Sequence, residues 1–219
     1  MTAVKRRAYR STIRRGEAPA LVCEAAYRLF STKGYLATSI EDIAAEAGVA
    51  RPTVFTAVGP KPVILRAVVD QALAGDDAPV PIAERPWWRE AIEEPDAVRS
   101  IQLYARNMCR ISGRAGLVLR ALETAASIDP EAAEVWARFQ HQRRVGLHEL
   151  AVSLTEKTDA LRCDEDTITD TMWALAPNAY LRLVHDAGWP VERFQAWLAD
   201  LLQRMFLADP AGSRENPLP

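Results

Sequence analysis

The sequence predicts an all-α protein of about nine helices, divided into a small N-terminal domain and a larger C-terminal helical domain. Its 219 residues are 49% apolar and 26% charged, which is enough to build a sizeable core. Apolar residues recur at i, i+3 and i+4 along most of the chain, and strand-forming segments are scarce. A cluster of Gly, Asp and Pro after residue 74 interrupts this pattern, so we place the domains at 19–74 and 75–208.

The charge is unevenly distributed along the chain. Residues 1–60 carry nine Lys/Arg against five Asp/Glu, a balance of +4, so the remainder carries 18 against 24, a balance of −6, and the total is −2. This asymmetry indicates that only the N-terminal part meets a polyanion. A basic arm at 1–18, with Arg6, Arg7 and Arg10, would add phosphate or minor-groove contacts; the alternative is a solvated tail.

Composition also bears on location and on bound groups. No apolar run reaches about 18 residues, so we expect no membrane-spanning helix. The basic N-terminus lacks the apolar run of a secretory signal. Cys23, Cys109 and Cys163 are far apart and form no CxxC pair, which favours a reducing compartment without a zinc site. We therefore expect a cytoplasmic protein with no membrane contact, metal or cofactor.

The first and fourth helices are marked by proline and glycine. Pro19 suits the opening turn of a helix over about 19–33, and Gly34 ends it. The fourth helix begins at Lys61-Pro62 and continues to Leu73.

Two short helices are expected between them. Thr38 and Glu41 have the spacing of a capping box, which would open a helix over 39–47 that ends at Gly48. A third helix starts near Arg51, where a following proline is tolerated, and runs to about residue 57.

The larger domain has longer apolar patterns. We expect helices at about 95–112, 115–127, 130–158, 164–186 and 190–208. Pro177 lies inside one of them and should kink it. The tail at 209–219 is rich in proline and polar residues, so it should be disordered.

The two short helices have the features of a helix-turn-helix. Gly48 supplies a tight turn, and Ala44 is small at a point where a larger side chain would push the second helix away. Val49 and Val54 can form the small core that fixes the crossing angle. The start of the second helix, with Arg51, would then point toward the major groove of DNA.

Residues 20–70 resemble the DNA-binding domain of the TetR (tetracycline repressor) family. The shared pattern is Phe-x-x-x-Gly-Tyr at 30–35, Thr-Ser-Ile-x-x-Ile-Ala at 38–44, Ala-Gly-Val at 47–49 and Thr-Val-Phe at 53–55, with Lys61 at the start of the fourth helix. The resemblance implies a sequence-specific transcriptional regulator, by default a repressor. It also implies a homodimer, a near-palindromic double-stranded DNA operator, and a small-molecule effector that releases the operator.

Carried over by position, the resemblance implies roles for individual residues. Arg51 and Thr53 face base edges, whereas Ser39, Phe55 and Lys61 lie at the phosphate backbone. Thr56 belongs to either set, and Pro52 is counted among the DNA-binding residues. An arginine can donate two hydrogen bonds to a guanine. Position 55 is usually Tyr, so Phe55 lacks a hydroxyl for phosphate, and Ala50 replaces a common capping Ser. We therefore expect affinity to depend mainly on Arg51, Lys61 and the basic arm.

The resemblance further implies an effector pocket and a two-fold interface in the larger domain. The expected pocket residues are Leu103, Tyr104, Asn107, Met108, Trp136, Phe139, Gln140, Trp173 and Asn178. The expected dimer residues are Tyr180, Phe194, Trp197, Leu198, Leu201 and Met205. Ordinary core packing is the alternative interpretation for each pocket residue, and a simply buried terminal helix is the alternative for the interface.

Two other function classes compete with a DNA-binding regulator. A helical adaptor that binds protein without DNA would have a similar composition. An enzyme is disfavoured, because the sequence has no HExxH, phosphate-binding glycine loop or nucleophile elbow.

Overall fold

The computed structural model describes residues 16–75 and 82–208. In these ranges the regular elements are helical, apart from one isolated bridge between Leu161 and Leu207, so the predicted all-α fold is confirmed. The expected roles of Arg6, Arg7 and Arg10 and of the tail at 209–219 lie outside the described residues.

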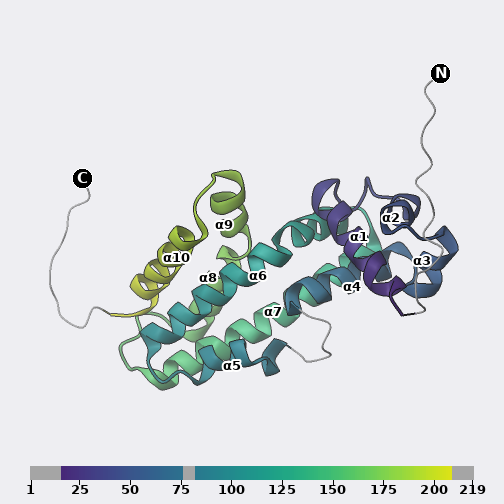
Figure 1. The fold of residues 1–219 in the computed structure, drawn as a ribbon. Helices are drawn as coiled ribbons and strands as arrows, with labels where there is room; N and C mark the ends of the chain where they lie inside the picture. The colour runs from purple at the N-terminus through teal and green to yellow at the C-terminus, as the bar shows by residue number, and fades with distance from the viewer. Residues whose placement is uncertain (1–15, 76–81, 209–219) are drawn as a thin grey trace. The chain divides into compact units, whose positions relative to one another are not determined.

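The chain divides into two compact units. The first comprises the described part of Met1–Asp76 together with Leu117–Arg138, and the second comprises Asp77–Gly116 and Phe139–Pro219, again as far as they are described. Two long helices, α6 (Ala97–Ala126) and α7 (Pro130–Lys157), contribute residues to both units (Figure 1). Residues 117–138, which the sequence analysis placed in the 75–208 domain, thus group with the N-terminal helices.

Four N-terminal helices form most of the first unit. They are α1 (Ala18–Thr32), α2 (Ile40–Ala47), α3 (Arg51–Ala57) and α4 (Lys61–Ala74), and α1 packs against the other three (Figure 1). The most deeply buried side chains of these helices include Val22, Phe30, Ile43, Val54 and Ile64. One apolar side of each short helix is therefore used for packing, as the sequence pattern predicts.

The cap of α2 differs from the prediction. The N-cap is Ser39, whose Oγ accepts from the Asp42 amide, while the Ser39 amide donates to the Asp42 carboxylate. Thr38 is buried, and its hydroxyl donates to the Gly34 carbonyl. The predicted box of Thr38 with Glu41 is thus wrong by one residue. Both registers offer a hydroxyl and a carboxylate, but Thr38 is drawn inward by packing, and Glu41 is left for another contact.

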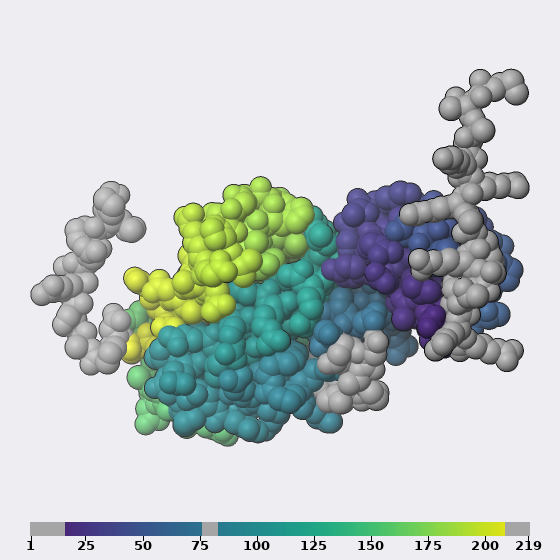
Figure 2. Space-filling view, viewed as in Figure 1, coloured from purple at the N-terminus to yellow at the C-terminus, as the bar shows by residue number. Residues whose placement is uncertain are grey.

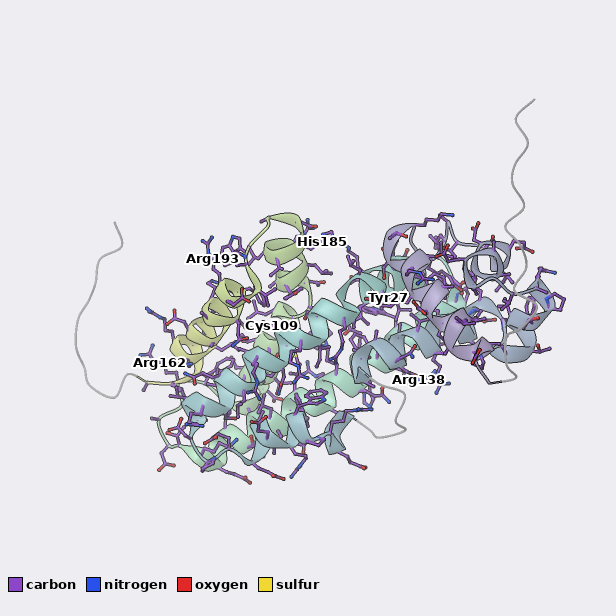
Figure 3. All side chains as sticks on the ribbon, viewed as in Figure 1. Tyr27, Cys109, Arg138, Arg162, His185 and Arg193 are labelled. Carbon is purple, nitrogen blue, oxygen red and sulfur yellow. The ribbon has the colours of Figure 1, made fainter. Side chains whose placement is uncertain are left out.

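The second unit contains the remaining elements. They are η1 (Ile82–Glu84), α5 (Pro86–Glu93), the first part of α6, most of α7, α8 (Glu165–Leu175), α9 (Asn178–Tyr180), the π-helical turn η2 (Leu181–Asp186) and α10 (Val191–Phe206). In Figure 2 the yellow surface of α10 lies against the blue-green surface of α6. Their common core includes Tyr104, Leu150, Phe194 and Phe206. Cys109 of α6 lies inside this core (Figure 3).

The predicted break between helices at 95–112 and 115–127 is wrong, because α6 is continuous. Gly113 and Gly116 lie within it. A Cβ at these two positions would lie 3.2 Å from the Tyr180 hydroxyl oxygen and 3.0 Å from Leu181 Cδ2, respectively. The glycines therefore allow Tyr180 and Leu181 to approach α6, and they do not end the helix.

The predicted helix over 164–186 is interrupted, not merely kinked. It ends at Leu175, Ala176 is extended, and a new helical turn begins after Pro177. A proline removes one backbone donor and clashes with the preceding turn, which accounts for the position of the break. Arg143 of α7 donates to the carbonyls of Met172, Trp173 and Ala176 at this end of α8. The short helix α5 was not predicted.

Candidate nucleic-acid interface

Helix α3 exposes one side and buries the other. It spans Arg51–Ala57 as predicted and is anchored by Val54, which is fully buried. The turn before it contains Gly48 in the left-handed region, at φ 69°, a conformation that favours glycine. Arg51, Pro52, Phe55 and Thr56 are exposed, and Thr53 is half-buried. The residues predicted to meet DNA are thus mostly accessible on a single short helix.

Arg51 has two neighbours. Its Nε lies 2.5 Å from a carboxylate oxygen of Glu41 on α2, and its guanidinium lies 5.3 Å from the ring centroid of Phe55, one turn further along α3. Glu41 was expected to take part in a helix cap, and its ion pair with Arg51 was not predicted. The signal that could have revealed it is the second cap register, Ser39 with Asp42, which leaves Glu41 without a capping role.

The hydroxyls near this surface already make local bonds. Ser39 Oγ accepts from the Asp42 amide at 3.0 Å. The bonds from Ser39 hold the pKa of the Asp42 carboxyl below its usual value. Thr56 Oγ1 lies 3.2 Å from each of the Pro52 and Thr53 carbonyls, to which it donates. The Thr56 hydroxyl proton is therefore less free to be donated to a phosphate, whereas the bond to Ser39 Oγ uses its oxygen as an acceptor and does not engage its proton.

Lys61, at the start of α4, is half-buried. Its ammonium lies 4.1 Å from the ring centroid of Tyr35. Burial lowers the pKa of Lys61, and the nearby Asp129 carboxylate opposes this shift. The Tyr35 hydroxyl donates to Asp129 Oδ2 at 3.1 Å. Burial, followed by the same carboxylate, raises the pKa of Tyr35. Lys61 thus belongs to a compact cluster with Tyr35 and Asp129.

Comparison with known proteins assigns this arrangement to a family. Residues 22–68 match the family model of the bacterial regulatory proteins of the tetR family. Residues 22–68 form a DNA-binding domain of the TetR type. The chain is thus a DNA-binding transcriptional regulator. A search among curated proteins finds no match.

Solved structures of other regulators share the fold of this chain. NalD, the secondary repressor of the MexAB-OprM multidrug efflux pump in Pseudomonas aeruginosa, is 20% identical with a TM-score of 0.67, over 88% of this chain and 98% of NalD. A candidate transcriptional regulator from Saccharomonospora viridis, in complex with choline, is 17% identical with a TM-score of 0.65, over 88% of this chain and 99% of that one. A candidate TetR-family regulator from a Rhodococcus species is 14% identical with a TM-score of 0.63, over 86% and 98% of the two chains.

The predicted effector residues have different environments. Tyr104 and Asn107 are almost fully buried. Leu103, Met108, Trp136, Phe139 and Gln140 are half-buried, whereas Trp173 and Asn178 are exposed. Trp136 belongs to the first unit and the other eight to the second. A hollow of about 410 Å³ in the first unit is lined by residues 30–37 and by Leu117, Arg120, Ala121 and Thr124 of α6, and thus by none of the predicted nine.

Two buried amide oxygens in the second unit lack a hydrogen-bond partner. Asn107 Nδ2 donates to the Trp87 carbonyl at 2.6 Å, but Asn107 Oδ1 has no partner, and neither has Gln140 Oε1. Buried acceptors of this kind are costly, so each is a place where a donor would be stabilising.

Three of the predicted dimer residues are core residues. The side chains of Tyr180, Phe194 and Leu198 are buried within this chain and offer little surface to a partner. Their apolar spacing is explained by packing inside the second unit. Trp197 and Leu201 are half-buried, and Met205 is 44% exposed. Arg193, which lies over Trp189, and His185 project outward near the start of α10 (Figure 3).

Within the described ranges, no helix combines the length and the apolar character needed to cross a bilayer. Those same ranges contain no group of three or more His, Cys, Asp or Glu residues placed to hold a metal ion.

Proposed function

We propose that this regulator is a cytoplasmic repressor that binds a near-palindromic operator as a homodimer and leaves it when a small molecule binds. The observation that carries the proposal is the exposed N-terminal part of α3, led by Arg51. Arg51 and Thr53 would read base edges in the major groove, flanked by Pro52. Ser39, Phe55, Thr56 and Lys61 would lie along the phosphates, with Arg6, Arg7 and Arg10 adding to them.

The homodimer is supported by apolar surface on α10. Met205 and Val191 are 44% and 38% exposed, and Trp197 and Leu201 are partly accessible. Apolar residues on the surface of a terminal helix suit a two-fold contact with a second copy. Such a contact would set the spacing of the two α3 helices at about 34–36 Å, one turn of DNA.

The interface has a direct test. Met205→Glu should shift the protein from dimer to monomer in sedimentation velocity, because a charge would be placed between two apolar surfaces. Arg204→Ala changes the adjacent residue, which is 77% exposed in its side chain, and should leave the dimer intact. A Met205→Glu protein that remains dimeric would place the interface elsewhere.

The effector is supported by the unpartnered oxygens of Asn107 and Gln140. A medium-sized, largely apolar molecule with an N–H or O–H donor would satisfy such an acceptor while its remaining surface contacts Leu103 and Met108. The S. viridis protein of the same fold is in complex with choline, and NalD is a repressor. An effector that binds best to a conformation unable to span successive grooves would lower operator affinity by its differential affinity for the two states.

Binding of the full-length protein to DNA from upstream of its own gene tests the function. Affinity should fall steeply as salt is raised, and it should exceed that for unrelated DNA of equal length. A protein that binds both DNAs equally, with and without candidate ligands, would instead be the protein-binding adaptor. Release of the specific complex by a small molecule would establish the effector step.

A further inference from the structure

The contact of Glu41 with Arg51 carries an inference that rests on the proposed DNA binding and makes it more specific. We propose that Glu41 is a specificity-determining residue, which orients the Arg51 guanidinium so that its outer end reads one guanine of the operator. Glu41 would not touch the base itself and would act through Arg51.

The atoms in contact suit this role. Glu41 meets Arg51 through Nε, the inner nitrogen of the guanidinium. The terminal nitrogens Nη1 and Nη2 lie beyond Nε, at the outer end of the planar group. Guanine presents N7 and O6 side by side in the major groove, which two parallel N–H groups can match. The ion pair thus engages the side of the guanidinium that base reading does not need.

A second contact restricts the same group. The ring of Phe55 lies 5.3 Å from the guanidinium carbon, in the range of a cation–π interaction. Glu41 on α2 and Phe55 on α3 therefore hold the guanidinium from two directions. A free arginine side chain samples many rotamers, and fixing it before DNA arrives lowers the entropic cost of the bidentate contact. This gives Phe55 a function that does not depend on the missing hydroxyl.

Stabilisation of the fold does not account for the ion pair between Glu41 and Arg51. The side chains of Arg51 and Glu41 are 59% and 63% exposed, and exposed pairs contribute little to folding. The other carboxylates of α2 have their own contacts, Asp42 with the Ser39 amide and Glu46 with Arg28 at 3.2 Å. A carboxylate beside the DNA-reading arginine repels phosphate. Glu41 should therefore weaken nonspecific binding while sharpening base selection.

The experiment begins with the wild-type dimer and a pool of randomised duplexes, from which bound sites are selected and sequenced. Arg51→Ala identifies the base pair at which selection depends on that side chain. Glu41→Gln should then reduce discrimination at that base pair by roughly tenfold, because a neutral amide oxygen holds Nε more weakly than a carboxylate does. The same variant should bind unrelated duplex DNA more tightly than wild type at low salt.

Glu46→Gln is the matched control. It removes one negative charge from the same helix without touching Arg51, so it should raise nonspecific binding and leave discrimination unchanged. In an Arg51→Ala background, Glu41→Gln should have no further effect on discrimination, because a residue that acts through Arg51 has nothing left to orient.

Two results would overturn the inference in different ways. If Glu41→Gln keeps the wild-type discrimination while Arg51→Ala loses it, Glu41 has no role in specificity and the proposed function survives. If the wild-type protein selects no sequence at all, the proposed DNA reading fails and the role of Glu41 fails with it.

Discussion

The two units use charged side chains in opposite ways. In the first unit, Arg51 and Glu41 pair on an exposed surface, where their contact contributes little to stability. In the second, Arg143 is half-buried and donates to three backbone carbonyls where α8 ends. The first pair is available to an external partner, whereas the second arginine is occupied by the chain itself. The same residue type therefore indicates recognition in one unit and architecture in the other, and burial distinguishes the two.

The largest expected effect would test the architectural role of Arg143. Arg143→Ala should lower the free energy of unfolding by about 2–4 kcal/mol, because the carbonyls at the end of α8 lose a charged donor in a poorly solvated place. Arg144→Ala removes an exposed partner of Asp170 and should cost about 0.5 kcal/mol or less. Urea unfolding of the two variants checks this difference, and equal losses would show that burial does not separate the two arginines.

The proposed recognition role of Arg51 predicts the reverse pattern. Arg51→Ala should leave the unfolding free energy and the dimer nearly unchanged but should cost about 1–3 kcal/mol of discrimination between operator and non-operator DNA. Titration of both duplexes with wild type and variant measures it. Arg28→Ala, which breaks exposed pairs with Glu24 and Glu46, is the control for loss of one positive charge in the same unit. Unchanged discrimination in Arg51→Ala would mean that α3 is not the reading helix.

Glycines within the long helices give the next effect. Gly116→Val should destabilise the second unit by about 1–3 kcal/mol, because its side chain would press against Leu181. A Cβ at Gly146 would meet Trp88 at an ordinary 3.5 Å, so Gly146→Ala should stabilise α7 by about 0.5–1 kcal/mol. Thermal unfolding distinguishes the opposite signs. A stabilising Gly116→Val would show that the approach of Leu181 to α6 is loose.

The smallest expected effect is the dependence of stability on pH, which has opposite signs in the two units. Burial raises the pKa of the Cys109 thiol to about 11. Between about pH 9 and 11 the unfolded chain releases this proton while the folded chain retains it, so stability should fall as pH rises, by about 1–2 kcal/mol. Unfolding of Cys109→Ala at pH 8–11 should show a weaker decline of stability with pH than wild type, with Cys163→Ala as the control.

In the first unit, the lowered pKa of Asp42 gives the opposite dependence of stability on pH, because stability is lost as pH falls and the carboxyl is protonated.

The sequence was most informative where local chemistry sets the boundaries of an element. The ends of α3 and α4 follow Arg51-Pro52, Lys61-Pro62 and the left-handed glycines, and these are features of neighbouring residues. The continuity of α6 could not be inferred locally. Gly113 and Gly116 resemble a break until Tyr180 and Leu181, more than 60 positions later, are placed against them.

For the candidate site, sequence reasoning found the exposed residues of α3 but not their orientation. Arg51 and Phe55 were named from a motif, whereas the pairing with Glu41 depends on how α2 crosses α3 and on which of two cap registers forms. In the second unit, apolar spacing on α10 could not separate a side facing the core from a side facing a partner. Phe194 and Leu198 were therefore assigned to an interface although they are core residues.

The carboxylate of Asp129 connects the N-terminal helices to the start of α7, so a shortened DNA-binding fragment would lose this connection. Its Oδ1 accepts from the amides of Glu131 and Ala132 at the start of α7, at 3.0 and 3.1 Å, while its Oδ2 accepts from the Tyr35 hydroxyl. A fragment cut at residue 75 would keep Tyr35 but discard its acceptor and the neighbouring turns of α6 and α7. A minimal DNA-binding fragment should therefore retain the residues where α6 ends and α7 begins. Without them, Tyr35 would be exposed, because its packing is completed by residues much later in the chain.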